Sequence, residues 1–461
     1  MKSVPRSFSE ITDSLSSLEG IMPLVRLGTK RYSAWPAIKN FLFQKCSGDM
    51  IKARNNQPLD LLSRQGIFYF LISIVNFLRL IWGRGRARKI ILTASSGLLV
   101  HEMQIIDSYS ALKLNSSKNI FFINCNNIKN FSRFKSEIFK NCIIVDNYSL
   151  GILSRIFGLA VKAVYRFFPT MFFNHSNLID SVSALKEHGF NVEKKELSDV
   201  IVKFLSEYFI YRIVFNLLGP KEALIVSAFS KSGICAALKH GGVSVTELQH
   251  GIVGRTHHGY NYRPHLKSST PEMPTPDSIA VYNSFWKEEL CLPGFFKQEQ
   301  VFISGRLKYD IATEPIELPG LKKEQYVIFT GQAAFYVEIA GFVNSLIALC
   351  KEMDLALTFA YRPHPKESIE DINRLYKLID SNMNFVVIGN ELDITTEQLI
   401  YNSKLHLSIF SACHFDAIHF KGRSFVLDTG VDGAIDYFIS KYKGDKFVIV
   451  CSADDLVKFL C

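Results

Sequence analysis

The chain has 461 residues, which at about 150 residues per domain predicts two or three domains. Its apolar share of 48% supplies large cores and excludes a largely disordered protein. With 53 Lys and Arg against 43 Asp and Glu, the net charge of +10 favours anionic partners, whether nucleic acid, nucleotide-linked substrates or a membrane surface. Nine scattered cysteines without a CxxC pair exclude a disulfide framework or a zinc site and indicate free thiols in a reducing compartment.

Residues 1–84 are predicted to form a mostly helical N-terminal region, with one helix beginning near Pro36. The start of the chain lacks the apolar core of a signal peptide. The run Ile67–Trp82 falls short of the roughly 18–20 apolar residues that span a bilayer, and the basic stretch Gly83–Lys89 follows it. Such a segment suits either a helix on a membrane surface or a buried helix with a solvated basic end. Ile152–Phe173 has the same character, and this repetition favours attachment to a membrane surface.

Residues 85–275 alternate short β-rich runs with amphipathic helical patterns. Buried strands are expected at 89–94, 119–124, 142–146, 223–227 and 243–246, and helices at 197–218 and 231–239. This alternation predicts an α/β domain of the Rossmann-like kind, with a parallel sheet covered by helices on both faces.

A polar, proline-containing stretch at 262–276 is interpreted as a linker, after which the alternation resumes. Strands are expected at 278–282, 300–304, 326–330, 356–360, 385–388, 406–409 and 424–428, and helices at 336–353, 368–381 and 413–421. Residues 276–461 are therefore predicted to form a second Rossmann-like domain. Two such domains in tandem would face a cleft, which is the usual place for a ligand.

The loop that follows the strand at 243–246 combines one carboxylate, three imidazoles and several glycines. The candidate site residues in it are Glu247, Gln249, His250, His257, His258 and Tyr260. Loops at the C-terminal ends of strands carry ligand chemistry in α/β sheets. A neutral imidazole, or a carboxyl with a raised pKa, can accept a proton there near pH 7. We therefore predict a catalytic site in this loop, with His250 or Glu247 as the general base.

A second set of polar residues follows strands of the C-terminal half. Arg362 and His364, in the sequence Tyr-Arg-Pro-His-Pro, come directly after the strand at 356–360, where the prolines stiffen the loop. Ser411 is placed to cap the helix at 413–421, whose first N–H groups would then meet an anion. Gly331 and Gln332 follow the strand at 326–330. These residues are predicted to bind phosphate, and without a P-loop or an Asp-x-Asp motif no metal is required.

The order of these motifs resembles that of GT-B glycosyltransferases which build bacterial capsule and lipopolysaccharide. Gln249-His-Gly251, Arg362-Pro-His-Pro365 and Ser408-Ile-Phe-Ser411 are similar to motifs of bacterial sialyl- and polysialyltransferases and of CDP-glycerol glycerophosphotransferases. The resemblance spans roughly residues 220–430. Gln249 stands where the glycerophosphotransferases have tryptophan, Ser411 lacks their preceding aspartate, and the acidic-acidic-Gly motif of the sialyltransferases is absent, with only Glu247 nearby.

The resemblance implies a GT-B fold that transfers a sugar, with inversion, from a nucleotide-activated donor to a glycan or lipid-linked glycan at the inner face of the plasma membrane. It implies a base at His250 or Glu247, an acceptor side at Gln249, His257, His258 and Tyr260, and donor binding by Arg362, His364, Ser411, Gly331 and Gln332. It implies no metal, cofactor or nucleic acid. Polyol phosphate transfer of the CDP-glycerol kind, epimerisation of a UDP-sugar, and a non-catalytic role in a polysaccharide assembly complex stay open as alternatives.

Overall fold

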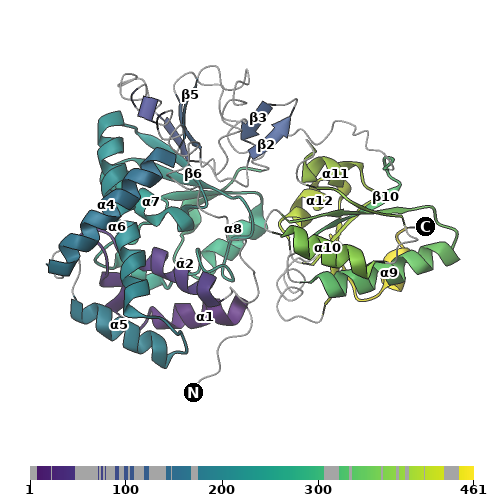
Figure 1. Cartoon of the computed structure of the whole chain (residues 1–461), viewed down its shortest axis with the longest axis horizontal. Helices are drawn as coiled ribbons and strands as arrows, with labels where there is room; N and C mark the ends of the chain where they lie inside the picture. Colours follow the sequence, from purple (N-terminus) through teal and green to yellow (C-terminus); the bar gives the residue numbers. More distant parts are fainter. Residues whose placement is uncertain are drawn as a thin grey trace. The chain divides into compact units, whose positions relative to one another are not determined.

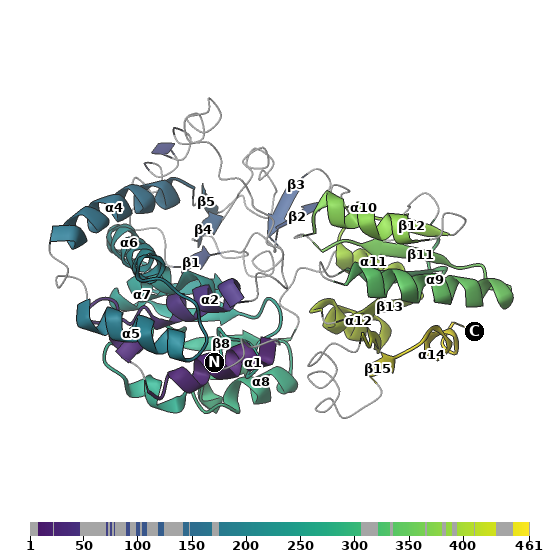
Figure 2. The ribbon, with the colours of Figure 1, turned by 60° about the horizontal axis from the view of Figure 1, so that its bottom comes forward.

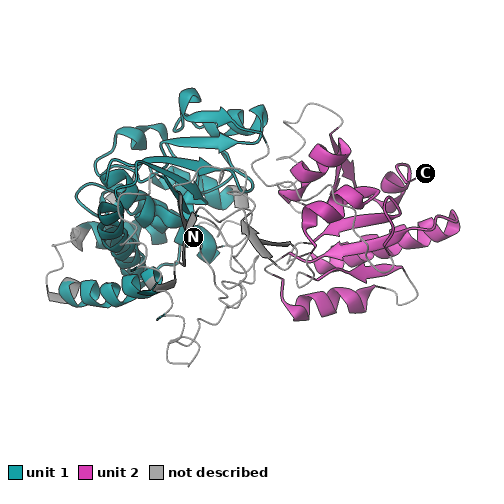
Figure 3. Cartoon of the chain, turned by 90° about the horizontal axis from the view of Figure 1, so that it is seen from above, with its two compact units in different colours: residues 1–47, 57–98, 104–309 teal, residues 48–56, 99–103, 310–461 magenta. Residues whose placement is uncertain are grey.

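The computed structural model divides the chain into two compact units, shown in Figure 3. Unit 1 comprises residues 1–47, 57–98 and 104–309, and unit 2 comprises residues 48–56, 99–103 and 310–461. The structure describes residues 8–21, 23–46, 71, 74–75, 78, 89–92, 98–101, 104–107, 119–123, 142–146, 148–167, 175–305, 321–331, 335–364, 367–379, 384–389, 394–409, 411–429 and 446–460. Each unit is built around one parallel sheet.

The sheet of unit 1 has the strand order β5-β4-β1-β6-β7-β8-β9, with every neighbouring pair parallel. Its strands are β1 (Lys89–Leu92), β4 (Asn119–Ile123), β5 (Cys142–Asp146), β6 (Glu222–Val226), β7 (Ser244–Leu248), β8 (Ser278–Val281) and β9 (Val301–Ile303). The chain runs outward from β1 to β5 and then returns to β6 on the other side of β1. This reversal creates a topological switch point between β1 and β6, and ligands of α/β sheets bind beside such points. A separate two-stranded sheet pairs β2 (Leu98–His101) with β3 (Gln104–Asp107).

Helices of unit 1 include both N-terminal helices. They are α1 (Phe8–Leu18), α2 (Trp35–Cys46), α4 (Tyr148–Phe167), α5 (His175–Glu187), α6 (Lys194–Leu218), α7 (Ser232–His240) and α8 (Ser284–Cys291), with the 3-10 turns η1 (Pro23–Arg26), η6 (Ala228–Lys231), η7 (Pro264–Ser268) and η8 (Gln298–Gln300). Helix α4 lies along α6, and α6 packs on α7 (Figures 1 and 2). Trp35, Ile38 and Leu42 of α2 are fully buried. The N-terminal helices therefore belong to the body of unit 1.

Unit 2 has the strand order β12-β11-β10-β13-β14-β15, again with every neighbouring pair parallel. Its elements are β10 (Tyr326–Thr330), α9 (Tyr336–Glu352), β11 (Thr358–Arg362), α10 (Ile369–Leu378), β12 (Phe385–Val387), α11 (Thr396–Asn402), β13 (Leu405–Ser408), α12 (Cys413–Lys421), β14 (Ser424–Leu427), β15 (Phe447–Val450) and α14 (Ala453–Val457). Helices α9 and α10 cover one face of the sheet, and α11 and α12 cover the other (Figure 1). The switch point of this sheet lies between β10 and β13.

The predicted α/β class, with two Rossmann-like domains, is confirmed, but the boundary expected at residue 276 is wrong. Strands β8 and β9, which were assigned to the second domain, extend the first sheet beyond β7. The polar stretch before β8 is tied to unit 1, because Asp277 accepts a hydrogen bond from the N–H of Val245 at 2.9 Å and forms an ion pair with Lys239 at 2.8 Å. A loop between strands and a linker between domains have the same composition, so the sequence pattern alone did not separate them.

The two predicted membrane segments differ in how much of them is described. Most of Ile67–Lys89 lies outside the described residues, apart from positions 71, 74, 75 and 78, which are helical, and Lys89, which begins β1. Ile152–Phe173 overlaps α4 up to Phe167. Within the described part of the chain, no helix combines the length and hydrophobicity needed to cross a bilayer.

Candidate functional site

The turn between β6 and α7 lies beside the switch point of unit 1 and has a strained backbone. Ser227 adopts a left-handed conformation with φ of +58°, which is uncommon for a residue other than glycine. The N–H of the next residue, Ala228, donates a hydrogen bond to Oε1 of Glu247 at 2.9 Å. Strain of this kind costs on the order of 1–3 kcal/mol and concentrates at functional sites. The turn is therefore the first part of a candidate site.

Glu247 is the buried carboxyl at the centre of this site. It lies in β7, opposite Ile225 of β6, and its side chain is only 1% exposed. Besides the Ala228 N–H, Oε1 accepts a hydrogen bond from the hydroxyl of Tyr260 at 2.6 Å, whereas Oε2 has no hydrogen-bond partner among the described residues. Burial raises the pKa of Glu247 to about 7, although its two hydrogen bonds and the charge of Lys231 act in the opposite direction. This carboxyl can therefore gain or lose a proton near neutral pH.

Lys231, at the end of the β6–α7 turn, adds a second ionisable group with a half-buried side chain. Its Nζ donates a hydrogen bond to the carbonyl of Val226, the last residue of β6, at 2.5 Å. Burial lowers the pKa of Lys231 to about 8, while the negative charges of Glu247 and Glu207 partly offset that effect. The carboxyl of Glu247 in β7 and the amine of Lys231 in the turn therefore both titrate close to neutral pH, which is a pattern found at functional sites.

Phe229 of the same turn is the ring around which the predicted histidines gather. The ring centroids of His250, His257, His258 and Tyr260 lie 6.0, 4.8, 5.5 and 5.8 Å from that of Phe229. Gly259 allows this approach, because a Cβ at that position would come within 2.6 Å of the Phe229 side chain. The loop predicted as the site is thus folded against a residue that the sequence did not single out.

His257 and His258 have structural contacts that leave them neutral. Nδ1 of His257 accepts a hydrogen bond from the N–H of Gly259 at 3.1 Å, and burial lowers the pKa of His257 to about 4. His258 is hydrogen-bonded through Nε2 to Oδ1 of Asn40 at 2.9 Å and is stacked between the rings of Phe43 and His257. Burial holds the pKa of His258 well below its usual range. The predicted acceptor-side role does not fit His258, whose side chain is buried against α2.

Gln249 and Tyr260 also differ from their predicted acceptor-side roles. Both polar atoms of the Gln249 side-chain amide form hydrogen bonds within the protein. Nε2 donates to the carbonyl of Gly251 at 2.8 Å, and Oε1 accepts from the N–H of Tyr282 at 2.9 Å. Gln249 therefore ties the loop to the end of β8. Tyr260 is 1% exposed and its hydroxyl is committed to Glu247. Both side chains therefore hold neighbouring parts of the site in position through hydrogen bonds within the protein.

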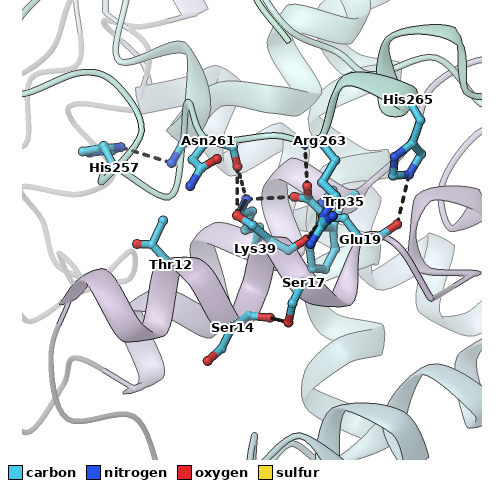
Figure 4. Close-up of polar contacts among 12 residues, drawn as sticks. Thr12, Ser14, Ser17, Glu19, Trp35, Lys39, His257, Asn261, Arg263 and His265 are labelled. Carbon is cyan, nitrogen blue, oxygen red and sulfur yellow. Dashed lines mark hydrogen bonds and ion pairs between the residues drawn. The ribbon is translucent and has the colours of Figure 1, made fainter. Parts of the chain in front are cut away.

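The N-terminal helices hold the far side of this loop through a buried ion pair, shown in Figure 4. Nζ of Lys39 in α2 lies 2.8 Å from Oε1 of Glu19, which follows α1, and it also donates to the carbonyl of Asn261. The other oxygen of Glu19 accepts from the N–H of Arg263 at 2.9 Å. Trp35 adds a hydrogen bond from Nε1 to Oε1 of Glu19 at 2.7 Å. Because both ends of the loop segment 261–263 are bonded to these two helices, the helices fix the position of the segment that carries Tyr260.

In unit 2, Arg362 does not have the phosphate-binding geometry that the sequence predicted. Its guanidinium turns toward the loop after β12, where it donates to the carbonyls of Ile388 at 3.2 Å, Gly389 at 2.5 Å and Ile394 at 2.8 Å. The side chain is buried at 7% exposure. Arg362 is therefore a structural clamp on that loop, and the sequence did not reveal the carbonyls that it would meet.

The remaining predicted donor residues lie at the C-terminal ends of β10, β11 and β13. The N–H of Gly331 donates to the carbonyl of Arg362 at 2.8 Å, and a Cβ on Gly331 would collide with Tyr361 and Glu367. His364 is exposed, and its N–H donates to Oε1 of the buried Glu367 at 3.0 Å. The structure thus brings Gly331, Arg362 and His364 together. Gln332 lies outside the described residues.

Ser411 lies just before α12 but is not the N-cap that the sequence predicted it to be, because the helix begins at Cys413 and Ala412 occupies the N-cap position. The Oγ of Ser411 accepts a hydrogen bond from the N–H of Cys413 at 3.2 Å. The hydroxyl of Ser408, at the end of β13, donates to the carbonyl of Thr330 at 2.7 Å and links this strand end to that of β10. Ser411 therefore follows a strand that neighbours β10 at the switch point of unit 2.

A buried hydrogen-bonded chain beneath this edge was missed by sequence reasoning. Nε2 of His414 lies 3.2 Å from the carbonyl of Ile409, which only accepts, so that nitrogen donates. Its Nδ1 must then accept from Oγ of Ser424 at 2.7 Å, and Ser424 accepts from Nδ1 of His406 at 2.7 Å. Nε2 of His406 finally accepts from Oγ1 of Thr330 at 2.9 Å. Burial lowers the pKa of His414 to about 4 and holds the pKa of His406 well below its usual range, so both rings are neutral.

Comparison with known proteins identifies similar folds at low sequence identity. No protein-family model matches the chain, and no curated protein matches its sequence. A UDP-N-acetylglucosamine 2-epimerase aligns over 81% of this chain and 86% of its own, with 10% identity and a TM-score of 0.47. The UDP-GlcNAc 2-epimerase from Neisseria meningitidis bound to UDP-GlcNAc aligns over 81% and 88%, with 12% identity and a TM-score of 0.44. The apo structure of OtsA aligns over 81% and 90%, with 8% identity and a TM-score of 0.42. Residue roles are not carried over at these identities.

Proposed function

We propose that the protein is an enzyme of the GT-B kind that acts on a nucleotide-activated sugar and transfers the sugar to an acceptor hydroxyl, with Glu247 as the general base. The observation that carries this proposal is the state of the Glu247 carboxyl. It is buried, its pKa is about 7, and Oε2 has no hydrogen-bond partner among the described residues. A base of this kind operates best when its pKa lies near the working pH.

The proposed reaction begins with the acceptor hydroxyl, whose proton passes to Oε2 of Glu247. The acceptor oxygen then forms a bond to the anomeric carbon while the bond to the nucleotide phosphate breaks and the electron pair leaves with the phosphate. Tyr260 and the Ala228 N–H keep Oε1 in place during this step, since both donate to it. We rank Glu247 ahead of His250, the other predicted base, because the pKa of Glu247 lies near neutral pH.

The donor phosphate is proposed to bind unit 2 without Arg362. The guanidinium of Arg362 is occupied by three carbonyls, whereas His364 is exposed and the start of α12 follows Ser411. The first N–H groups of a helix attract an anion, and an exposed imidazole can donate to a phosphate oxygen. His364 and the start of α12 are therefore the proposed groups that stabilise the leaving phosphate.

Transfer would be tested by replacing Glu247 while binding and turnover are measured separately. Binding of CMP, CDP, UDP and GDP by calorimetry identifies the nucleotide, and release of that nucleotide from its sugar conjugates with a glycan acceptor reports turnover. Glu247→Gln should lower turnover by about 10²–10⁴-fold and leave nucleotide affinity unchanged. Glu289→Gln, which changes another buried carboxyl of unit 1, serves as the control. Normal turnover in Glu247→Gln would contradict the proposal, and binding of no nucleotide would favour a non-catalytic role.

Epimerisation of a UDP-sugar is the second candidate. A desolvated carboxyl such as Glu247 is also suited to removing a proton from carbon, because burial strengthens the carboxylate as a base. Incubation of each nucleotide sugar in D2O without an acceptor separates the two reactions. Deuterium incorporation and a new sugar isomer in the NMR spectrum would establish epimerisation, whereas products that form only with an acceptor would establish transfer. Transfer from CDP-glycerol would instead identify a polyol phosphate transferase.

A further inference from the structure

Helix α4 presents an apolar surface that no described part of the chain covers. Leu153, Ile156, Leu159 and Val164 are all exposed, with Ile156 at 57% and Leu159 at 67%. The opposite face packs on α6, where Gly158 lies within contact distance of the side chains of Ser206 and Val202. The helix is therefore firmly seated on unit 1 while a row of large apolar side chains remains in contact with water.

Basic residues border this exposed face. Arg155 is exposed, and Lys162, two helical turns further on, has a side chain that is 47% exposed and forms an ion pair with Asp199 of α6 at 2.7 Å. Arg166 follows four residues later. The stretch from residue 147 to residue 179 contains these three cations and no Asp or Glu. An apolar face bordered by cations is the pattern of a helix that lies in the interface of an anionic membrane.

The distribution of charge along the chain points the same way. Residues 61–101 contain six Lys and Arg and no acidic residue, so this stretch and residues 147–179 together account for nine of the ten net positive charges. Within the first stretch, the described residues Leu71, Val75 and Leu78 are helical and exposed. Their spacing of four and three residues places them on one side of a helix. Two separate stretches of the chain thus combine exposed apolar residues with an excess of basic over acidic residues, of which Lys162 and Lys89 form ion pairs with Asp199 and Glu222.

We infer that the exposed face of α4, defined by Leu153, Ile156, Leu159 and Val164, docks on the surface of an anionic lipid bilayer. Association with a second copy of the chain is disfavoured, because two such faces would bring the exposed Arg155 of each copy into one interface, to which α4 itself contributes no acidic residue. A bilayer that contains anionic lipid satisfies both the apolar side chains and the cations. This inference does not depend on the chemistry proposed for Glu247.

Flotation of the full chain with lipid vesicles tests the inference. The chain should bind phosphatidylcholine vesicles that contain phosphatidylglycerol, and binding should weaken as salt is raised. Arg155→Gln with Arg166→Gln should lower the partition coefficient by roughly 30-fold, because each cation near an anionic surface contributes a factor of about five. Ile156→Glu with Leu159→Glu should abolish binding. Ile369→Glu, at a 63% exposed position of α10 in unit 2, is the matched control and should bind like the parent.

A second measurement avoids any variant that fails to fold. Leu159→Trp keeps the face apolar, and brominated lipid should quench the added fluorescence, whereas Ile369→Trp should not be quenched. Failure of the unmodified chain to bind anionic vesicles, or full binding by Ile156→Glu with Leu159→Glu, would overturn the inference. A concentration-dependent dimer that the same double variant abolishes would assign the face to a second copy of the chain instead.

Discussion

Replacement of Glu247 by glutamine should change how the stability of unit 1 depends on pH, whatever the substrate proves to be. In the folded protein burial raises the pKa of this carboxyl from 4.5 to about 7, so the unfolded chain ionises it at lower pH than the folded chain does. The stability of the parent should therefore fall as pH rises from about 4.5 toward 7 and level off above the folded pKa. Glutamine has no such proton, so the variant lacks this component.

The size of the effect follows from the two pKa values. Each unit of difference between the folded and unfolded pKa corresponds to about 1.4 kcal/mol. Because the carboxyl of Glu247 is half ionised at pH 7 in the folded state, it should lower the free energy of unfolding by about 3 kcal/mol between pH 4 and pH 7. Glutamine keeps an oxygen for the Ala228 and Tyr260 donors and adds a constant cost for its buried amide. Only the pH-dependent difference between parent and variant is diagnostic. The range stops at pH 7 because Lys231 begins to titrate above it.

Urea unfolding followed by tryptophan fluorescence is the appropriate assay. The three tryptophans, Trp35, Trp82 and Trp286, all belong to unit 1, so their emission follows the unit that contains Glu247. The free energy of unfolding of the variant minus that of the parent should become more favourable to the variant by about 3 kcal/mol from pH 4 to pH 7. A difference that stays constant across this range would show that Glu247 has an ordinary pKa and would remove the main support for its role as a base.

Three further predictions concern contacts that the structure assigns. Lys39→Met should lower the unfolding free energy of unit 1 by about 3–5 kcal/mol in the fluorescence assay, because Glu19 then keeps a buried charge without its partner. Lys45→Met, which breaks an exposed ion pair with Glu196, is the control and should cost about 0–1 kcal/mol. Equal costs for the two variants would refute a stabilising role for the buried Lys39–Glu19 ion pair. Arg362→Ala should cost about 1.5–3 kcal/mol and speed amide hydrogen exchange in the loop after β12, and an unchanged exchange rate would contradict the clamp. Ser424→Ala should lower the melting temperature of unit 2 in calorimetry by an amount that corresponds to about 1–3 kcal/mol, because two imidazoles lose their shared hydroxyl, and it should leave the tryptophan transition of unit 1 in place.

Local pattern was enough to predict the elements and the class of fold. The sequences of β1, β4, β5, β6 and β7 are short, apolar and rich in β-branched residues. Strands that are buried on both faces of a parallel sheet require this composition. The expected strand at 243–246 corresponds to β7, which extends to Leu248, so Glu247 lies in the strand and not in the loop that the sequence predicted. The helix that follows Ser411 was predictable from its local pattern, but the cap was misplaced by one residue, because Ala412 and not Ser411 occupies the N-cap position.

Roles that depend on distant partners were not predictable from the chain alone. Arg362 follows a strand and precedes a proline, as a phosphate ligand could, but its partners are carbonyls about thirty residues further on. The sequence around Phe229 and Lys231 contains no motif that indicates a functional site. Only the fold of the β6–α7 turn places these two residues beside Glu247 and the histidines. The boundary at residue 276 was misplaced because strand pairing, which decides membership of a sheet, leaves no mark on composition.

The sequence by itself therefore determined the alternation of strands and helices, the basic apolar character of α4 and the residue types available near Glu247, because these depend on neighbours within a few positions. The tertiary structure alone decided which of those residues are ionisable near neutral pH and which serve as scaffold. Glu247 owes its raised pKa to burial, against which the hydrogen bonds from Ala228 and Tyr260 act, and His258 owes its neutrality to burial against α2, where it contacts Phe43 and Asn40. Desolvation is a property of the assembled surroundings, so it is absent from any short stretch of the chain.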